Sequence, residues 1–293
     1  MKHAKLKITA LLLAASLALA GCASSSESAD DSSSAEGGYT IAIPNDTTNE
    51  ARALLLLEDL GLITLDPDAG ILATPLDITD NPYNIEFEEV EAAQIPNILQ
   101  DVDYAVINSN YAIDAGLNPT TDSLAQEGSS SAYVNIVAVL EGNETTPEAL
   151  ALKAAVESQD VADYIAENYD GAVVSAVDNP TDGYTDEVDY DALAGTTISV
   201  AASPSPHAQI LEDVVAPILE AKGITLDVRV FEDYVQPNNV VEEGEIFANY
   251  FQHVPYLDDF NEQNGTHIVS LAGVHVEPMG IYGGQQSSLD VFN

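Results

Sequence analysis

Basic side chains are scarce in this chain of 293 residues. Seven lysine and arginine residues stand against 49 aspartate and glutamate residues, so the formal net charge is −42 at pH 7. Nucleic acids and anionic membrane surfaces attract proteins through basic faces. The charge therefore excludes both as electrostatic partners, and we expect no nucleic acid to bind.

Cysteine occurs only once, which excludes a disulfide framework and any cysteine-based metal cluster. The sequence also contains none of the common motifs for phosphate loops, dinucleotides, zinc proteases or serine hydrolases. The histidines are too scattered to indicate a metal site, and we expect neither a cofactor nor an enzyme. A secreted acidic hydrolase with paired carboxylates is the alternative, but no pair of acids stands out.

Apolar residues make up 46% of the chain, enough for a sizeable core despite the charge. Runs typical of strands alternate with runs typical of helices, which predicts an α/β fold. The predicted strands are Tyr39–Ile43, Ile85–Val90, Tyr104–Asn108, Val134–Leu140, Thr197–Ala201, Leu226–Phe231, Ile246–Phe251 and His267–Leu271. The predicted helices are Asn49–Leu60, Glu91–Gln100, Pro147–Ser158, Val161–Asn168, Pro206–Lys222 and Pro255–Gln263. Residues 178–195 are polar and predict a linker or a long surface loop.

The first 38 residues are typical of a secreted, lipid-anchored protein. Residues 1–21 combine three lysines with an apolar run too short to span a bilayer, which predicts a signal peptide. The end of this segment and the residue after it read Leu19-Ala20-Gly21-Cys22, which resembles the lipobox of bacterial lipoproteins. This resemblance implies an extracytoplasmic protein with a lipid on Cys22. Residues 22–38 are rich in serine and acids, which predicts a flexible tether. An ordinary cleaved signal with an incidental cysteine is the alternative.

Loss of the signal peptide would leave four basic residues, Arg52, Lys153, Lys222 and Arg229, and a net charge of −45. Arg52 follows a run at 45–49 that is rich in helix N-cap residues. Helix N-termini attract anions, and a guanidinium group grips a carboxylate through two parallel hydrogen bonds. Arg52 is therefore either a ligand-binding residue or a structural partner of nearby acids.

Two sets of runs carry a family resemblance. The first set is Ile41–Leu57, Ala105–Asn108 and Ala132–Asn135, and the second is Pro206–Ala208, Phe231–Asn238 and Asn249–Asp258. These runs resemble the methionine-binding lipoproteins of bacterial ABC importers, the NlpA/MetQ family. The resemblance implies a two-lobed fold of the type II periplasmic-binding-protein kind, with a hinge and a cleft between the lobes.

The two sets occur in the opposite order in the family, so the chain resembles a circular permutation. The original termini would be joined through residues 178–195, and Ser287–Asp290 resembles the stretch that normally precedes the Ile41 strand. The two termini of a domain often lie close together, and exposed loops tolerate the new chain ends that a permutation creates. A truncated remnant of a tandem duplication is the alternative.

Permutation predicts how the chain divides. Residues 39–130 would form the second lobe of the family, and residues 131–282 would form its first lobe. A tail at 283–293 would return to the lobe at 39–130. The chain would cross between the lobes near Tyr133 and Tyr282, which preserves a hinge.

The resemblance also implies a ligand site that draws on both lobes. Arg52 matches the arginine that holds the ligand carboxylate, and Asn108 and Asn135 match amides that bind the backbone of the ligand. Without the resemblance, capping would be the usual role of such asparagines.

The other lobe would contribute Tyr234, Phe251 and His253. Phe251 and His253 lie two residues apart and would share one face of a strand. An aromatic wall suits a thioether, because contacts between sulfur and rings are favourable. The alternative is core packing for the two aromatic residues and a structural hydrogen bond for the histidine. Further candidates of lower weight are Tyr256, Asn238, His207, Met279 and Tyr282.

These residues predict a binding protein that captures L-methionine or a related small amino acid in an interlobe cleft. It would deliver the ligand to the permease subunits of an ABC importer and be held at the membrane by the lipid on Cys22. The alternatives are the same fold with another ligand, such as a dipeptide or another apolar amino acid, and a non-transport interaction lipoprotein.

Overall fold

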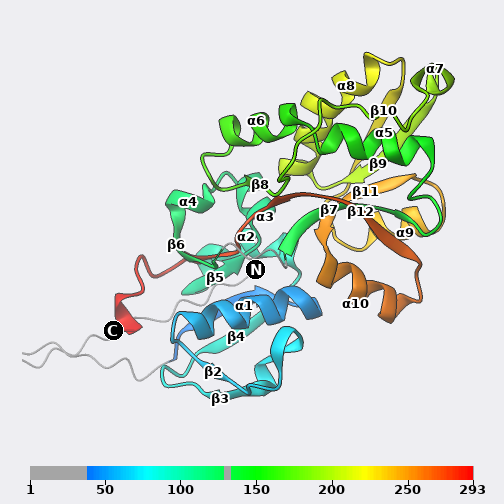
Figure 1. Ribbon diagram of the computed structural model, residues 1–293. Coiled ribbons are helices and arrows are strands. Elements are labelled where there is room, and N and C mark those ends of the chain that lie inside the picture. The colour runs from blue at the N-terminus through cyan, green and yellow to red at the C-terminus, as the bar shows by residue number, and fades with distance from the viewer. Residues whose placement is uncertain (1–37, 129–132, 293) are drawn as a thin grey trace, which may run out of the picture. The chain divides into compact units, whose positions relative to one another are not determined.

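The computed structural model describes residues 38–128 and 133–292 (Figure 1). The predicted signal peptide, Cys22 and nearly all of the predicted tether lie outside these residues, as does the predicted boundary between residues 130 and 131. The described residues form an α/β fold around two main sheets, as expected. No helix within the described ranges is both long and apolar enough to cross a bilayer.

Lobe 1, which we define as residues 38–128 and 280–292, surrounds a five-stranded sheet with the strand order β4-β1-β5-β13-β6. β1 is parallel to β4 and β5, whereas β13 is antiparallel to β5 and β6. These strands are β1 (Thr40–Pro44), β4 (Glu86–Val90), β5 (Tyr104–Ile107), β6 (Ser123–Gln126) and β13 (Gly280–Gly283). The helices are α1 (Thr47–Asp59), α2 (Ile95–Ile98), α3 (Ser109–Asp114) and α4 (Pro119–Asp122), and a small ribbon pairs β2 (Thr64–Leu65) with β3 (Ile78–Asp80).

Lobe 2, defined as residues 133–276, surrounds a six-stranded sheet with the order β10-β9-β11-β7-β12-β8. Its strands are β7 (Val134–Leu140), β8 (Val174–Ser175), β9 (Thr197–Ala202), β10 (Thr225–Val230), β11 (Ala248–His253) and β12 (Ile268–Val276). Its α-helices are α5 (Pro147–Val156), α6 (Gln159–Asn168), α7 (Tyr190–Leu193), α8 (Ala216–Glu220), α9 (Gln236–Glu242) and α10 (Val254–Asn264). The wider helical turns η6 (Pro204–Ala208) and η7 (Leu211–Val215) precede α8.

Both faces of each main sheet are covered. In β1, Ile41 and Ile43 pack into one buried apolar cluster, whereas Ala42 packs into another. Successive side chains of a strand point to opposite faces, so the alternation places a cluster on each side of the sheet. A strand buried on both faces has an almost continuous apolar sequence. This is why the short apolar runs in this acidic chain predict its strands well.

The chain passes between the lobes twice, and the two connections are joined to each other. The first lies between β6 and β7, and the second between β12 and β13. The backbone N–H of Glu127 donates to the carbonyl of Met279 (2.9 Å), and the backbone N–H of Met279 donates to the Glu127 carboxylate (3.0 Å). β13 belongs to the sheet of lobe 1, so the second crossing lies between the end of β12 and the start of β13, just before Tyr282.

The tail packs on lobe 1. The ring of Phe292 lies 5.0 Å from that of Tyr39 and 4.9 Å from that of Tyr83. β9 shares the sheet of β7, as predicted for the strand at 197–201, and β1 lies in the other sheet.

Two predicted elements differ from the structure. The single helix expected at 91–100 is divided into η3 (Ala92–Gln94), α2 and η4 (Leu99–Asp101). Pro96 lies within this segment and has no N–H with which to continue the hydrogen bonds of a helix. The stretch at 178–195 is more than a surface loop, because it contains α7 and buries Val188 and Leu193 in the core of lobe 2.

Candidate functional site

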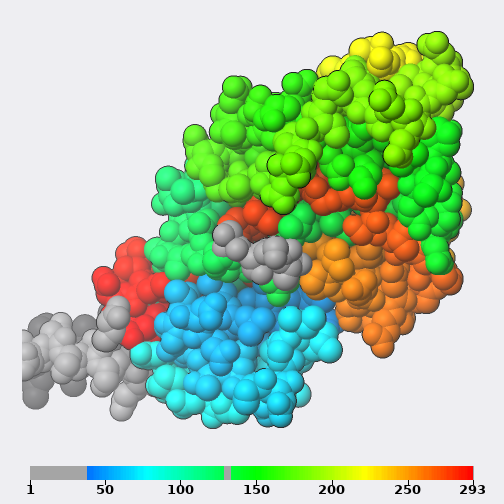
Figure 2. Space-filling model, in the orientation of Figure 1, coloured from blue at the N-terminus to red at the C-terminus, as the bar shows by residue number. Residues whose placement is uncertain are grey.

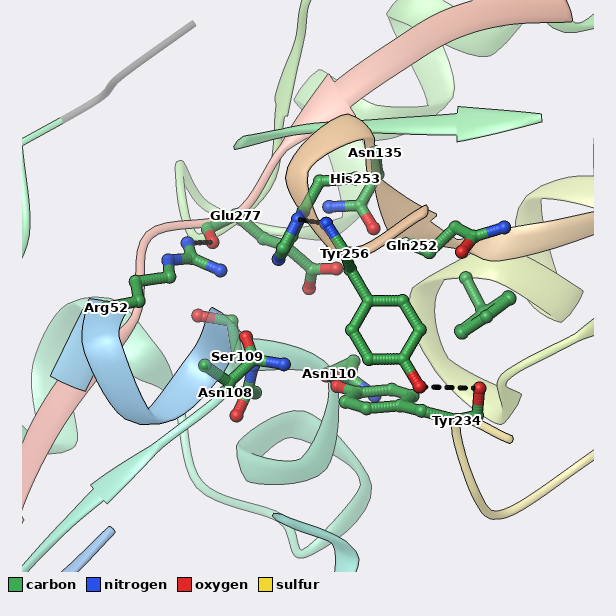
Figure 3. A pocket seen from close by; sticks show the side chains of 12 residues that line it. Arg52, Asn108, Ser109, Asn110, Asn135, Tyr234, Gln252, His253, Tyr256 and Glu277 are labelled. Carbon is green, nitrogen blue, oxygen red and sulfur yellow. Dashed lines mark hydrogen bonds between the residues drawn. The ribbon is translucent and has the colours of Figure 1, made fainter. Parts of the chain in front are cut away.

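A pocket lies between the lobes (Figure 3). All six residues that the resemblance implied as ligand contacts line it, and they come from both sides. The predicted residues are Arg52, Asn108, Asn135, Tyr234, Phe251 and His253, and the pocket adds Asn49, Ser109, Asn110, Gln252, Tyr256 and Glu277. The structure therefore brings the predicted set together, while its role in binding a ligand stays a prediction.

Arg52 lies on α1, and the start of that helix explains its position. The Asp46 carboxylate caps the helix by accepting from the backbone N–H of Asn49 (3.1 Å). Asn49 and Arg52 lie three residues apart and therefore share a helix face, which is directed to the pocket. The helix N-terminus thus already has an acidic cap of its own.

The guanidinium of Arg52 is buried and has three partners. Its Nε donates to both carboxylate oxygens of Glu127 (3.0 and 2.9 Å), and its Nη2 donates to Glu127 and to the main-chain carbonyl of Glu277 (3.1 Å). The ring of Tyr133 lies 4.4 Å from its central carbon. Burial alone would lower the pKa of Arg52, but Glu127 raises it above its usual value. The arginine is thus a charged group held in a fixed orientation.

Glu277 is the buried acid of the pocket, and the sequence did not single it out. Its side chain is largely excluded from solvent, and burial raises its pKa to about 7 despite the nearby His207 and Arg52. Its Oε1 lies 3.5 Å from His207 Nε2 and 3.4 Å from His275 Nε2. Its Oε2 is buried and has no hydrogen-bond partner among the described residues.

The two histidines beside Glu277 are neutral. Burial lowers the pKa of both His207 and His275 to about 3. His207 Nε2 lies 3.0 Å from Asn135 Oδ1, and His275 Nδ1 lies 2.5 Å from the Tyr250 hydroxyl. Although the two imidazoles and Glu277 lie close enough to hold a metal ion, these protein partners account for the arrangement as a hydrogen-bonded network.

Three buried polar atoms of pocket residues lack partners within the part of the chain that the structure describes. They are the acceptors Glu277 Oε2 and Asn108 Oδ1 and the donor Asn110 Nδ2. Buried polar groups are nearly always paired in folded proteins, and a buried group left unpaired costs roughly 1–3 kcal/mol. Both kinds of unpaired group therefore fit a polar ligand that offers donors and acceptors together.

Aromatic rings form the opposite wall of the pocket. The ring of Tyr234 lies 5.7 Å from that of Phe251 and 5.9 Å from that of Tyr256, and Phe251 and Tyr256 lie 5.9 Å apart (Figure 3). His253 caps α10 by accepting from the backbone N–H of Tyr256 (3.3 Å), and burial beside Arg52 keeps its pKa well below the usual value. This end of the pocket is apolar and uncharged.

The strand alternation expected at Phe251 and His253 is interrupted. The register of β11 against β7 shifts between Tyr250 and Gln252. Such a bulge inserts an extra residue and redirects the side chains around it. Gln252 therefore lines the pocket together with both of its neighbours.

The two lobes are hydrogen-bonded to each other around the pocket. The Tyr234 hydroxyl donates to Asn110 Oδ1 (2.7 Å), and the Tyr111 hydroxyl donates to the carbonyl of Glu232 (3.1 Å). On the face in Figure 2, the blue residues of lobe 1 lie next to the orange residues of lobe 2. The side chain of Gln263 in lobe 2 donates to the Thr47 hydroxyl in lobe 1 (3.2 Å). The structure thus represents the lobes in contact.

Four of the lower-weight candidates do not line the pocket. His207 lies behind Asn135, and Asn238 belongs to a buried amide network with Gln252 (3.0 Å). Met279 and Tyr282 pack into the two cores of lobe 1, because β13 belongs to that sheet. Cys22 lies outside the described residues.

Comparison with known families gives one match over most of the chain. The sequence model of a family described as "NlpA lipoprotein" matches residues 7–177 and 198–293. The unmatched interval, 178–197, contains the segment that we predicted to join the original termini.

Individual relatives match about half of the chain. A membrane lipoprotein, TpN32, of Treponema pallidum is 45% identical over 138 residues, which is 47% of this chain and 52% of the relative. The "D-methionine-binding lipoprotein MetQ" of Yersinia pestis is 39% identical over 139 residues, which is 47% of this chain and 51% of the relative. The chain thus spans about half the length of these relatives. The crystal structure of lipoprotein Tp32 from Treponema pallidum is 46% identical, with a TM-score of 0.45, and covers 46% of this chain and 56% of that one.

Proposed function

Because the chain belongs to the NlpA lipoprotein family, we propose that it is an extracytoplasmic substrate-binding protein that captures methionine for an ABC importer. The observation that carries the proposal is the polarity of the pocket. Arg52 and Glu277, two groups of opposite charge, line the same pocket as three aromatic side chains. This pattern suits a zwitterion that has an apolar side chain.

The ligand carboxylate would bind at Arg52. Among the described residues, the hydrogen bonds of Arg52 use Nε and Nη2, which leaves Nη1 for the ligand. The unpaired Nδ2 of Asn110 would be a second donor. Charge-assisted bonds of this kind are roughly twice as strong as neutral ones.

The ligand ammonium would bind at Glu277. It can donate to the unpaired Oε2 of Glu277 and to the unpaired Oδ1 of Asn108. The side chain would then extend toward Tyr234, Phe251 and Tyr256. A thioether gains roughly 0.3–1.5 kcal/mol from each good contact with an aromatic ring. Methionine satisfies all three parts of the pocket at once.

Delivery to a permease and a lipid on Cys22 belong to the same proposal. The name of the MetQ relative supports the ligand, and the family match supports a lipoprotein. Tight capture would then take place at the membrane, beside the transporter that removes the ligand.

Titration calorimetry of the full chain tests the ligand. L-Methionine, D-methionine, other apolar amino acids and methionyl dipeptides would each be titrated, and we expect a methionine enantiomer to bind most tightly. A dipeptide or another amino acid that binds more tightly would replace methionine as the ligand. If none of them binds, the interaction-lipoprotein alternative is favoured.

A further inference from the structure

We propose that Tyr250 and His275 position Glu277, so that its free oxygen accepts the amino group of the ligand. The inference rests on the proposed function only for the identity of that amino group. Neither Tyr250 nor His275 lines the pocket, and both are fully buried in lobe 2. They are positioning residues that act through the carboxylate in front of them.

The three side chains form a line from the core of lobe 2 to the pocket. The Tyr250 hydroxyl on β11 lies 2.5 Å from His275 Nδ1, and His275 Nε2 on β12 lies 3.4 Å from Glu277 Oε1. β7 separates the two strands in the sheet. Glu277 follows directly at the end of β12, so the line ends at the second connection between the lobes.

The chemistry of the three side chains determines which of them donates each hydrogen bond. A carboxylate can only accept hydrogen bonds, so His275 Nε2 must carry the proton that it shares with Glu277. A neutral imidazole has only one N–H, so Nδ1 is the acceptor and the Tyr250 hydroxyl is the donor. By donating to Nδ1, the Tyr250 hydroxyl therefore stabilises the tautomer of His275 that donates to Glu277. The hydrogen bond occupies Oε1 and leaves Oε2 for the ligand.

Other groups also face Glu277 and would affect its charge. Arg52 on α1 favours the ionised form through its charge. His207 in η6 is neutral, and its Nε2 lies 3.5 Å from Glu277 Oε1. Asp114 on α3 is an acid that interacts with Glu277 unfavourably, because the charge of Glu277 contributes to raising the pKa of Asp114. Among the described residues the Tyr250 hydroxyl is hydrogen-bonded to His275 and to none of these three groups, so its removal acts first on the His275 side of Glu277.

The test is Tyr250→Phe in the full chain, with Tyr104→Phe as the matched control. Each variant deletes the hydroxyl of a fully buried tyrosine, and Tyr104 donates to the carbonyl of Ser288 (2.8 Å) on lobe 1. Titration of the Glu277 carboxyl is followed by carbon NMR in protein labelled on glutamate, and its signal is identified by its loss in Glu277→Gln. We expect a higher pKa of Glu277 in Tyr250→Phe, because the tautomer of His275 that donates to the ionised carboxylate loses the hydrogen bond to its Nδ1.

The affinity for L-methionine gives the second readout. If the pKa of Glu277 rises from about 7 by about one pH unit, the ionised fraction at about pH 7 falls from about a half to about a tenth. The apparent affinity of the variant then falls about fivefold relative to wild type at that pH, and the difference between the two proteins disappears near pH 9, where Glu277 is ionised in both. Tyr104→Phe should leave both the pKa and the affinity unchanged.

Substitution of His275 completes the test. Glutamine places an amide N–H near the position of the imidazole Nε2, so His275→Gln should keep the affinity closer to wild type than His275→Leu does. An unchanged Glu277 pKa in Tyr250→Phe would overturn the positioning role, whether or not methionine binds. A raised pKa in a protein that does not bind methionine would support the positioning role and contradict the proposed function.

Discussion

Arg52 and Glu127 form a buried ion pair across 75 residues of sequence, and their side chains also fix the geometry of the pocket. The arginine donates through Nε to both oxygens of the carboxylate. Glu127 in turn accepts from the backbone of Met279 in the other connection between the lobes (3.0 Å). The cation expected to bind the ligand is therefore attached to the hinge, and the structural role of Arg52 and its ligand role coexist.

Arg52→Gln should weaken methionine binding strongly. It removes a charged hydrogen-bond donor, worth roughly 1.5–3 kcal/mol or about 10–150-fold in affinity. The substitution should also destabilise the fold by about 3–5 kcal/mol, because Glu127 loses its partner.

A double variant separates the two effects of Arg52. Arg52→Gln combined with Glu127→Gln leaves no unpaired charge, so thermal stability should recover while binding does not. Arg229→Ala is the control, since Arg229 is an exposed cation paired with Asp227 (2.9 Å). Calorimetry that shows full binding by the double variant would remove Arg52 from the site.

Methionine affinity should fall as the pH falls below about 7. Burial raises the pKa of Glu277 to about 7, and the protonated carboxyl cannot pair with an ammonium group. The ligand should therefore bind to the protein in which Glu277 is ionised, and Glu277 should release a proton on binding near neutral pH. Calorimetry in buffers of different ionisation enthalpy measures this proton release. Glu277→Gln should bind weakly, with a pH dependence in this range that is much reduced. An equally steep pH profile in that variant would assign the titration to another group.

High salt should stabilise the protein more than is usual. With a formal net charge of −42, repulsion among the carboxylates opposes the compact state, and salt screens it. The screening length falls from about 10 Å at 0.1 M to about 3 Å at 1 M. We expect a higher melting temperature in 1 M sodium chloride than in dilute buffer. Equal melting temperatures would show that the surface charges are spaced widely enough not to repel.

The circular permutation can be tested by reversing it. A variant that begins at Thr196, continues through the tail into Tyr39 and ends at 177 would restore the order of the family. The contact between the rings of Phe292 and Tyr39 (5.0 Å) shows that a short connection would suffice. We expect this variant to fold and to bind the same ligand. If it neither folds nor binds, the duplication-remnant alternative gains support.

The strands and the candidate residue Arg52 could be predicted from the residues alone because they contrast with the rest of the sequence. Apolar runs such as Val134–Leu140 stand out from an acidic background, and Arg52 stands out because cations are so few. Tyr234, Phe251 and His253 could be placed only through the resemblance, since their own pattern also fits core packing.

Glu277 and Glu127 show where this reasoning ends. Each is one of 49 acidic residues, and nothing in the sequence tells a desolvated carboxylate from a solvated one. The only local signal is that Glu277 follows the mostly apolar strand β12. Burial, which raises its pKa, arises from elements far apart in sequence, α1 and η6 among them. The bulge that brings Gln252 into the pocket is likewise set by pairing with β7.

The paired connections between the lobes have a mechanical consequence. The backbones of Glu127 and Met279 are hydrogen-bonded to each other (2.9 Å). We therefore expect the two connections to move together as one paired segment and not independently. Two paired segments bend easily out of their common plane, but their hydrogen bond opposes sliding and twisting of one segment against the other. We therefore expect the lobes to open and close by rotation about a single hinge axis. Each closure of the lobes would bring the Tyr234 hydroxyl back to Asn110 in the same orientation.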